Sequence, residues 1–313
     1  MSKEHVLMIG PYPEWDMAEL EARYTLHKLW QAEDEASFIA THAPNVRAIA
    51  TRGELGAAAS LMQDLPKLEL VSVYGVGTDA VDRTYAKLRG IAVTNTPDVL
   101  TEDVADIGIG LLLAAARKIP EGDAFVRSGR WAIGNMGLVT RVWGKRAGIV
   151  GMGRIGKALA QRLEAFACDI AYFSRKRRDE VPFHYEPDLV ALARDVDFLL
   201  VTVAGGEGTR GLITGEVLAA LGPDGIFVNI SRGTTVDEAA LLNALETRSI
   251  KAAGLDVFQN EPRIDPRFLK LDNVVLQPHH GSGPVETRQA MGKLVRDNLA
   301  AHFAGQPLLT PVL

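Results

Sequence analysis

Short apolar runs recur along the chain and alternate with longer stretches in which apolar residues are spaced as in helices. Nearly continuous apolar strands between helices are typical of a parallel sheet that is covered on both faces. Seven runs are expected to form such strands: Val6–Ile9, Leu70–Tyr74, Gly148–Val150, Ile170–Phe173, Phe198–Val203, Ile226–Ile230 and Val274–Leu276. The pattern predicts an α/β fold with doubly wound parallel sheets.

A helix that packs on several sides is expected at Val104–Ala116, because apolar and small residues cover most of its circumference. Thr101 and Asp103 precede this stretch and are candidate N-caps. The segment 95–98 just upstream contains Asn, Thr, Pro and Asp, which is typical of an irregular linker. We therefore expect the chain to cross between two domains near Asp98.

Composition and charge limit the kinds of partner that the chain is expected to bind. The 313 residues are 47% hydrophobic, enough for one large domain or two ordinary ones. The net charge of -5 provides no overall positive field, so no nucleic-acid partner is expected. No apolar run approaches the length that spans a bilayer, so no membrane partner is expected either.

Cys168 is the single cysteine, which excludes an internal disulfide and a multi-cysteine metal site. We expect no metal and a cytoplasmic location.

A glycine-rich turn follows the strand expected at 148–150 and precedes a helical stretch. Gly151, Gly153 and Gly156 form the pattern G-x-G-x-x-G, with Arg154 and Ile155 before the third glycine. In this setting the first glycine permits a tight turn, the second lets the backbone approach a pyrophosphate, and the third allows close helix packing. The alternative is a turn that serves packing alone. The strand-turn-helix context favours a dinucleotide site.

The strand expected at 170–173 ends where an NAD enzyme places an acidic residue against the ribose hydroxyl. This chain has Ser174, Arg175 and Lys176 there, followed by two more arginines. A hydroxyl followed by cations suits the 2'-phosphate of NADP, whereas a carboxylate would repel it. The alternative is a solvated basic loop, which Asp179 and Glu180 partly neutralise. The position favours NADPH as the cofactor.

Three polar residues follow later strands: Arg232, Glu261 and His279. Strand carboxyl ends face the ligand crevice in an open α/β sheet, so all three are placed where chemistry occurs. Each alone has a structural alternative: a surface ion pair, a turn residue before proline, or a buried imidazole with its bonds satisfied. Together they suit carbonyl reduction, because arginine grips a carboxylate, histidine donates a proton, and a carboxylate stabilises the imidazolium.

Longer motifs extend the pattern: 95–106 (NTPDVLTEDVAD), 229–241 (NISRGTTVDEAAL), 254–262 (GLDVFQNEP) and the pair Pro278-His279. With the glycine turn, these motifs and their order resemble the D-isomer-specific 2-hydroxyacid dehydrogenase family over nearly the whole chain. The segments 173–175 (FSR), 285–288 (VETR) and 307–312 (PLLTPV) are most similar to the hydroxyphenylpyruvate, hydroxypyruvate and glyoxylate reductases, which favour NADPH.

The resemblance implies a Rossmann NADP-binding domain, 99–284, inserted into a flavodoxin-like substrate domain, 1–98 and 285–313, which closes over the crevice. It implies catalytic roles for Arg232, Glu261 and His279. It also implies that the loop with Val76 and Gly77 binds the substrate carboxylate, as backbone N–H groups of a glycine-rich turn can do; an ordinary strand-ending turn is the alternative. Further cofactor contacts are implied for Thr101, Thr209, Ile230 and Asp256.

The expected activity is NADPH-dependent reduction of a small 2-keto acid, such as glyoxylate, hydroxypyruvate or an aryl pyruvate, to the D-2-hydroxy acid, with His279 as general acid. The resemblance further implies a homodimer, because Trp131 and Trp143 lie in a segment that makes dimer contacts in relatives. A different class, a nucleotide-sensing corepressor-like protein with little turnover, stays open. Segment 204–209 lacks the family's usual proline, and the roles of Arg52 and His280 stay open.

Overall fold

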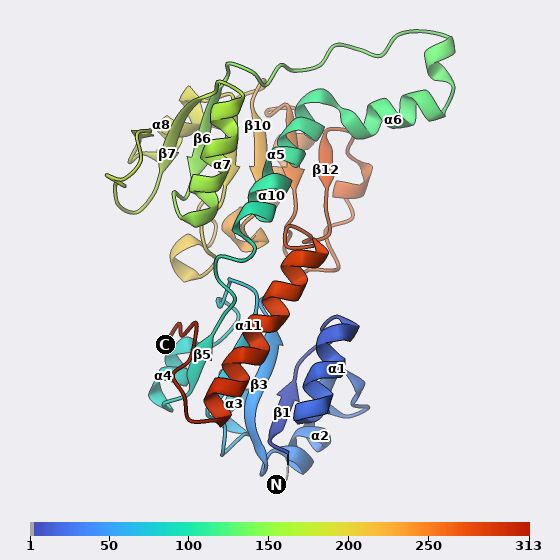
Figure 1. Ribbon diagram of the computed structural model, residues 1–313. Helices are drawn as coiled ribbons and strands as arrows, with labels where there is room; N and C mark the ends of the chain where they lie inside the picture. The colour runs from blue at the N-terminus through green and yellow to red at the C-terminus, as the bar shows by residue number, and fades with distance from the viewer. Residues whose placement is uncertain (1–2) are drawn as a thin grey trace. The chain divides into compact units, whose positions relative to one another are not determined.

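The computed structural model describes residues 3–313, which divide into two compact units. Of the described residues, the first unit comprises 3–100 and 283–313, and the second comprises 101–282 (Figure 1). The divisions fall after Leu100 and after Ser282, two residues beyond the crossing expected at Asp98 and two before the return expected at 284.

The first unit holds a five-stranded parallel sheet in the order β2-β1-β3-β4-β5. Its strands are β1 (His5–Met8), β2 (Thr25–Lys28), β3 (Val46–Arg52), β4 (Leu70–Tyr74) and β5 (Ala92–Thr94). Its helices are α1 (Glu14–Arg23), α2 (Glu35–His42), α3 (Ala59–Gln63), α4 (Arg83–Leu88) and α11 (Val285–Phe303). This strand order is the flavodoxin-like one.

The C-terminal segment is bound to the rest of the first unit at several places along its length. Arg296 of α11 forms an ion pair with Asp16 of α1, whose side chain is fully buried. Gly292 faces the same carboxylate, where a Cβ atom would overlap it. Farther along, Val312 donates a backbone hydrogen bond to Val93 in β5. Residues 285–313 are therefore an integral part of the first unit.

The second unit holds a seven-stranded parallel sheet in the order β12-β11-β10-β9-β6-β7-β8. Its strands are β6 (Arg146–Val150), β7 (Asp169–Phe173), β8 (His184–Tyr185), β9 (Phe198–Val201), β10 (Ile226–Asn229), β11 (Ala252–Leu255) and β12 (Val274–Leu276). Its helices are α5 (Thr101–Arg117), α6 (Ile119–Arg127), α7 (Arg154–Ala165), α8 (Leu189–Asp195), α9 (Gly215–Leu221) and α10 (Glu238–Glu246). The order reverses between β6 and β9, as in a Rossmann sheet. Both sheets confirm the expected fold class.

Helix α5 packs against β10, β11 and β12 on one side and against α7 on another. Gly254 of β11 faces Leu111 of α5 so closely that an added Cβ atom would lie 2.8 Å from the Leu111 Cβ. The expected packing on several sides is confirmed. The expected N-caps are wrong, because the helix already begins at Thr101 and Asp103 lies in its first turn.

Candidate active site

The glycine turn after β6 has a geometry that only glycine adopts without strain. Gly151 has φ +108°, and a Cβ atom there would lie 2.8 Å from the backbone nitrogen of Val203. A Cβ atom on Gly156 would overlap the carbonyl oxygen of Gly151, so the third glycine lets α7 approach the strand. Thr202, just after β9, donates a 2.6 Å hydrogen bond to that same carbonyl. The turn is therefore fixed from two strands.

The middle glycine has a different environment. Gly153 is the N-cap of α7, and no side chain caps the helix there. A Cβ atom on Gly153 would meet no other atom within 4 Å. The first N–H groups of a helix have no acceptor within the helix and attract anions. Open space above an uncapped helix N-terminus, which begins with Arg154 and Ile155, fits the pyrophosphate of a dinucleotide.

The basic loop after β7 is held in a defined conformation. Tyr172 accepts a 2.7 Å hydrogen bond from the Arg178 backbone N–H, and Tyr185 donates one of 3.1 Å to the carbonyl of Ser174. The Ser174 hydroxyl donates to the Lys176 carbonyl at 2.5 Å. These bonds hold the Ser174 hydroxyl and the cations that follow it at the carboxyl end of β7, the position expected from the sequence.

The acidic residues of this loop neutralise only part of its charge. Asp179 pairs with Arg177 at 3.3 Å, whereas Glu180 pairs at 2.9 Å with Lys157 of α7. Within residues 3–313, Arg175 and Lys176 form no ion pair, and both are exposed. Two cations next to Ser174 are therefore available to a phosphate group.

The other cofactor residues implied by the resemblance differ in their surroundings. Thr101 is the first residue of α5. Thr209 donates to the Ala204 carbonyl at 2.7 Å within its own loop. Ile230 is buried, with its Cδ1 beside Gly108 of α5. Asp256 is 2% exposed, and both of its carboxylate oxygens accept backbone N–H groups. Thr209 and Asp256 thus have their own hydrogen-bond partners in the protein.

Arg232, Glu261 and His279 follow three adjacent strands, β10, β11 and β12. The structure brings Glu261 and His279 together, because His279 Nδ1 lies 2.7 Å from Glu261 Oε2. The other carboxylate oxygen of Glu261 accepts the Phe258 backbone N–H at 2.7 Å. The Glu261 side chain is 23% exposed and that of His279 is 32% exposed, so the pair borders solvent.

Charge balance at this pair favours an ionised Glu261. Burial raises the pKa of Glu261, but the hydrogen bond and the charge of His279, the Phe258 N–H and the charge of Arg232 together hold it below its ordinary value. Arg232 is thus close enough to act on Glu261 electrostatically. A carboxylate beside an imidazole stabilises the imidazolium, which is the form that donates a proton.

The backbone around His279 is strained and is held by Asp256. His279 has φ +52°, in the left-handed region that costs a residue other than glycine about 1–3 kcal/mol. Asp256 accepts the N–H of His280 at 2.7 Å and that of Gly281 at 2.9 Å. Burial raises the pKa of Asp256, and these bonds oppose that rise. Here His280 contributes its backbone N–H, and its ring is on the exposed surface.

Arg232 is fixed mainly through its own loop. Its Nη1 donates to the Ser231 carbonyl at 2.8 Å. Its carbonyl accepts the Asn229 side-chain amide at 3.0 Å and the Thr235 hydroxyl at 2.6 Å. This network fixes the turn after β10 and thereby holds Arg232 at the carboxyl end of that strand.

In the first unit, the loop with Val76 and Gly77 follows β4 and is fastened to the segment after β5. Asn95 donates its side-chain amide to the Val76 carbonyl at 2.8 Å. Thr96 bonds Gly75 twice, with its hydroxyl accepting at 3.0 Å and its N–H donating at 2.9 Å. In residues 3–313, the N–H groups of Val76 and Gly77 have no hydrogen bond to protein. Arg52, at the end of the neighbouring β3, pairs with Glu54 at 2.5 Å.

Several residues that shape these sites were missed by sequence reasoning. Thr202 holds the glycine turn, and Asn229 holds the Arg232 turn. Both are short polar residues at the end of an apolar strand, so their position is a signal that could have identified them. Asn95 and Thr96 were interpreted as linker residues and as part of a family motif, but not as residues that hold the Val76 loop.

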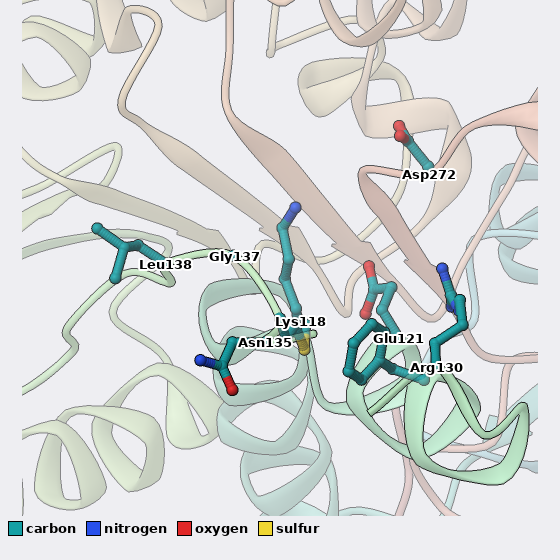
Figure 2. A pocket seen from close by; sticks show the side chains of 9 residues that line it. Lys118, Glu121, Arg130, Asn135, Gly137, Leu138 and Asp272 are labelled. Atoms are coloured by element: carbon teal, nitrogen blue, oxygen red, sulfur yellow. The ribbon is translucent and has the colours of Figure 1, made fainter. Parts of the chain in front are cut away.

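A cavity of about 270 Å³ lies elsewhere in the second unit, around α6 and the segment after it. Figure 2 shows Lys118, Glu121 and Arg130 around it, with Asp272 on another segment. The residues of the dinucleotide and catalytic sites do not line it. In the described part of the chain, no cluster of His, Cys, Asp and Glu is suited to a metal ion, and no helix has the length and apolarity to cross a membrane.

Comparison with known proteins gives a consistent assignment. The model of the D-isomer specific 2-hydroxyacid dehydrogenase NAD binding domain matches residues 109–281. Over 308 residues the chain is 47% identical to glyoxylate/hydroxypyruvate reductase A of Arabidopsis thaliana and, over 308 residues, 47% identical to the hydroxyphenylpyruvate reductase of Plectranthus scutellarioides. Each alignment covers 98% of this chain and 98% of the relative.

A solved structure agrees with these sequence matches. The NADPH-dependent glyoxylate/hydroxypyruvate reductase of Sinorhizobium meliloti, in complex with NADP and malonate, superposes with a TM-score of 0.91 and is 42% identical. The match covers 99% of this chain and 97% of that one. The chain therefore belongs to the D-isomer-specific 2-hydroxyacid dehydrogenase family. It is an NAD(P)-dependent 2-hydroxyacid dehydrogenase, and these relatives give no support to the corepressor-like alternative.

Proposed function

We propose that this enzyme uses NADPH to reduce a small 2-keto acid to the D-2-hydroxy acid, with His279 as the general acid. The observation that carries the proposal is the 2.7 Å contact between His279 Nδ1 and Glu261 Oε2. It leaves Nε2 as the ring nitrogen that donates a proton, and it sets a carboxylate against the imidazolium.

NADPH, held at the glycine turn after β6 and the basic loop after β7, would supply the hydride for the keto carbon. His279 donates a proton to the keto oxygen as negative charge develops there, a contribution of about a hundred- to ten-thousandfold in rate. Glu261 stays ionised and stabilises the imidazolium before that transfer. Arg232 binds the carboxylate of the keto acid with paired hydrogen bonds, and the N–H groups of Val76 and Gly77 serve the same carboxylate.

The preference for NADPH is supported by the loop after β7. Ser174 provides a hydroxyl, and Arg175 and Lys176 provide two exposed cations that make no ion pair within residues 3–313. Such a set binds a 2'-phosphate through charge-assisted hydrogen bonds. The Sinorhizobium meliloti relative is named as NADPH-dependent, which supports the same assignment.

The substrate class follows from the relatives and from the site. Glyoxylate, hydroxypyruvate and hydroxyphenylpyruvate, the substrates in the relatives' names, are all 2-keto acids. Arg232 and His279 address the carboxylate and the keto group that these molecules share. We therefore propose a 2-keto acid as substrate; a cytoplasmic location remains a prediction that rests on the single cysteine.

We also propose that the enzyme is a homodimer, joined through α6 and the segment that follows it. Figure 1 shows this segment extending away from the sheet of its own unit. It exposes large apolar side chains, with Trp131 at 65%, Ile133 at 89% and Leu138 at 101% of full exposure. Glu121 Oε2 is buried beside the cavity of Figure 2 and accepts no hydrogen bond from residues 3–313. A second copy would cover the apolar surface and supply donors.

One assay tests cofactor and substrate together. The loss of reduced-nicotinamide absorbance is followed with NADPH or NADH against glyoxylate, hydroxypyruvate, pyruvate and phenylpyruvate. Rapid oxidation of NADPH with at least one keto acid is expected. A strong preference for NADH would contradict the role given to Ser174 and Arg175, and no oxidation with any pair would contradict the proposed reaction.

A further inference from the structure

We propose that Glu238 is a positioning residue for catalysis, which locks the loop that carries Glu261 to the loop that carries Arg232. This inference rests on the proposed function. Glu238 is the first residue of α10, and its Oε2 accepts the backbone N–H of Gln259 at 2.8 Å. Gln259 lies between Phe258, whose N–H binds the Glu261 carboxylate, and Glu261 itself.

The two loops are joined by more than this bond. The Gln259 side-chain amide donates to the Val236 carbonyl at 3.1 Å. Gly233 packs so closely on the Phe258–Gln259 peptide that an added Cβ atom would overlap it. Gln259 is therefore held by its backbone at Glu238 and by its side chain at Val236, both of which follow Arg232 in sequence.

The Glu238 bond is the charged member of this set. Residues Phe258 and Gln259 present consecutive N–H groups to two different carboxylates, those of Glu261 and Glu238. A carboxylate that accepts a backbone N–H makes a stronger bond than a neutral acceptor does. Glu238 thus fixes the peptide whose neighbouring N–H orients Glu261, and through Glu261 it fixes the imidazole of His279.

The surroundings of Glu238 indicate that its carboxylate does more than interact with the dipole of α10. Burial raises the pKa of Glu238, and the nearby charges of Asp265 and Glu261 raise it further. The Gln259 N–H and the charge of Arg267 oppose this rise. An acidic residue whose only role is to interact with the helix dipole is expected to be solvated. This one is partly buried and faces the loop of the catalytic carboxylate.

Three variants test the inference, with turnover of the proposed reaction and pH profiles as readouts. Glu238→Ala removes the bond to Gln259, whereas Glu238→Gln keeps an oxygen that accepts it. Glu216→Ala is the matched control, because Glu216 is an exposed acidic residue in the first turn of α9. Tryptophan fluorescence with NADPH measures cofactor binding in each variant.

For Glu238→Ala we expect kcat to fall about ten- to a hundredfold, since small displacements of catalytic groups have effects of this size. The acidic limb of its rate profile should move to higher pH, because the Phe258 N–H and His279, which lower the pKa of Glu261, bind a displaced Glu261 less firmly. Glu238→Gln should retain kcat within about threefold, and NADPH affinity should not change in either variant. Glu216→Ala should match the wild type in every readout.

Amide hydrogen exchange separates this inference from the proposed function, because it needs no turnover. The N–H groups of Phe258 and Gln259 should exchange faster in Glu238→Ala than in the wild type, and at the wild-type rate in Glu238→Gln. Unchanged exchange, or wild-type kcat and pH profile in Glu238→Ala, would overturn the inference alone. If none of the keto acids supports NADPH oxidation by the wild-type enzyme, the proposed function is overturned instead.

Discussion

Glu261 and His279 are 18 residues apart in the sequence, yet Oε2 of one lies 2.7 Å from Nδ1 of the other. They come together because β11 and β12 are adjacent parallel strands, whose carboxyl ends lie at the same edge of the sheet. The histidine–carboxylate pair proposed to protonate the substrate is therefore assembled by strand order.

The first prediction concerns this pair. His279→Ala should lower kcat about a hundred- to ten-thousandfold, because it removes the general acid, while NADPH binding stays intact. Glu261→Gln keeps the shape but not the charge, so it should lower kcat less than His279→Ala does. Steady-state kinetics and a fluorescence titration with NADPH measure both effects. Normal turnover of His279→Ala would rule out its catalytic role.

The second prediction separates two glycines of the same turn. Gly153→Ala should fold with nearly unchanged melting temperature, because its Cβ atom meets no other atom within 4 Å, but it should weaken NADPH binding about tenfold or more. Gly156→Ala should instead lower stability by about 1–3 kcal/mol, because its Cβ atom overlaps the Gly151 carbonyl. Thermal unfolding and NADPH titration measure both. Equal loss of stability in the two variants would contradict the geometry.

The third prediction concerns cofactor choice. Ser174→Asp should raise the KM for NADPH about tenfold or more while leaving the KM for NADH within about threefold, because a carboxylate repels the 2'-phosphate. Arg175→Ala should act in the same direction. Arg177→Ala is the control, since Arg177 pairs with Asp179 at 3.3 Å and should change neither KM. An NADPH preference that survives Ser174→Asp would exclude this loop as its source.

The fourth prediction concerns acid stability of the first unit. His27 is 8% exposed, it lies 2.9 Å from the His5 ring nitrogen, and its ring stacks on that of His42. Burial first, then the charges of His42 and His5, lower the pKa of His27 from 6.5 to about 4. The unfolded chain therefore binds this proton at higher pH than the folded chain does. Stability should fall as the pH drops below 6.5, and the loss should be complete at about 4.

Urea unfolding at a series of pH values measures this effect. The contribution of one group has a slope of at most about 1.4 kcal/mol per pH unit. His27→Gln should show a smaller slope between pH 6.5 and 4 than the wild type. His184→Gln, which removes an exposed histidine, should leave the slope unchanged. Equal slopes in His27→Gln and the wild type would assign the acid sensitivity to other groups.

The fifth prediction tests the proposed dimer. Trp131→Glu places a charge on the exposed segment after α6, so it should convert dimers to monomers in light scattering. Trp15→Glu is the control, because Trp15 is also exposed, at 42%, but lies on α1 of the first unit. A wild-type protein that is monomeric at micromolar concentration would contradict the proposal directly.

Sequence patterns predicted the buried strands and the glycine turn well, because both depend on local features: apolar runs and glycines at fixed spacing. Strand ends were less accurate. Phe198–Val203 was expected as one strand, but β9 ends at Val201, and the hydroxyl of Thr202 just beyond it binds the Gly151 carbonyl. That bond joins residues 51 positions apart, so no local pattern contains it.

The strand before Glu261 was expected only from the place of that residue, and its bounds were not predicted from its own sequence. β11 consists of Ala252, Ala253, Gly254 and Leu255, whose small side chains give little strand signal. The reason for them is tertiary, since α5 packs directly on Gly254. Arg232, Glu261 and His279 were proposed as catalytic from their places after strands and from family resemblance. The contacts of Glu238 and Asp256, in contrast, join loops that meet only in the folded chain.

The continuous insertion of residues 101–282 has an evolutionary consequence. Arg232, Glu261, His279 and the glycine turn all lie inside this one stretch, while the loop with Val76 and Gly77 lies outside it. Under the proposed roles, a mutation in the flanking segments can change how the Val76 and Gly77 loop binds the substrate without changing the residues proposed for proton transfer.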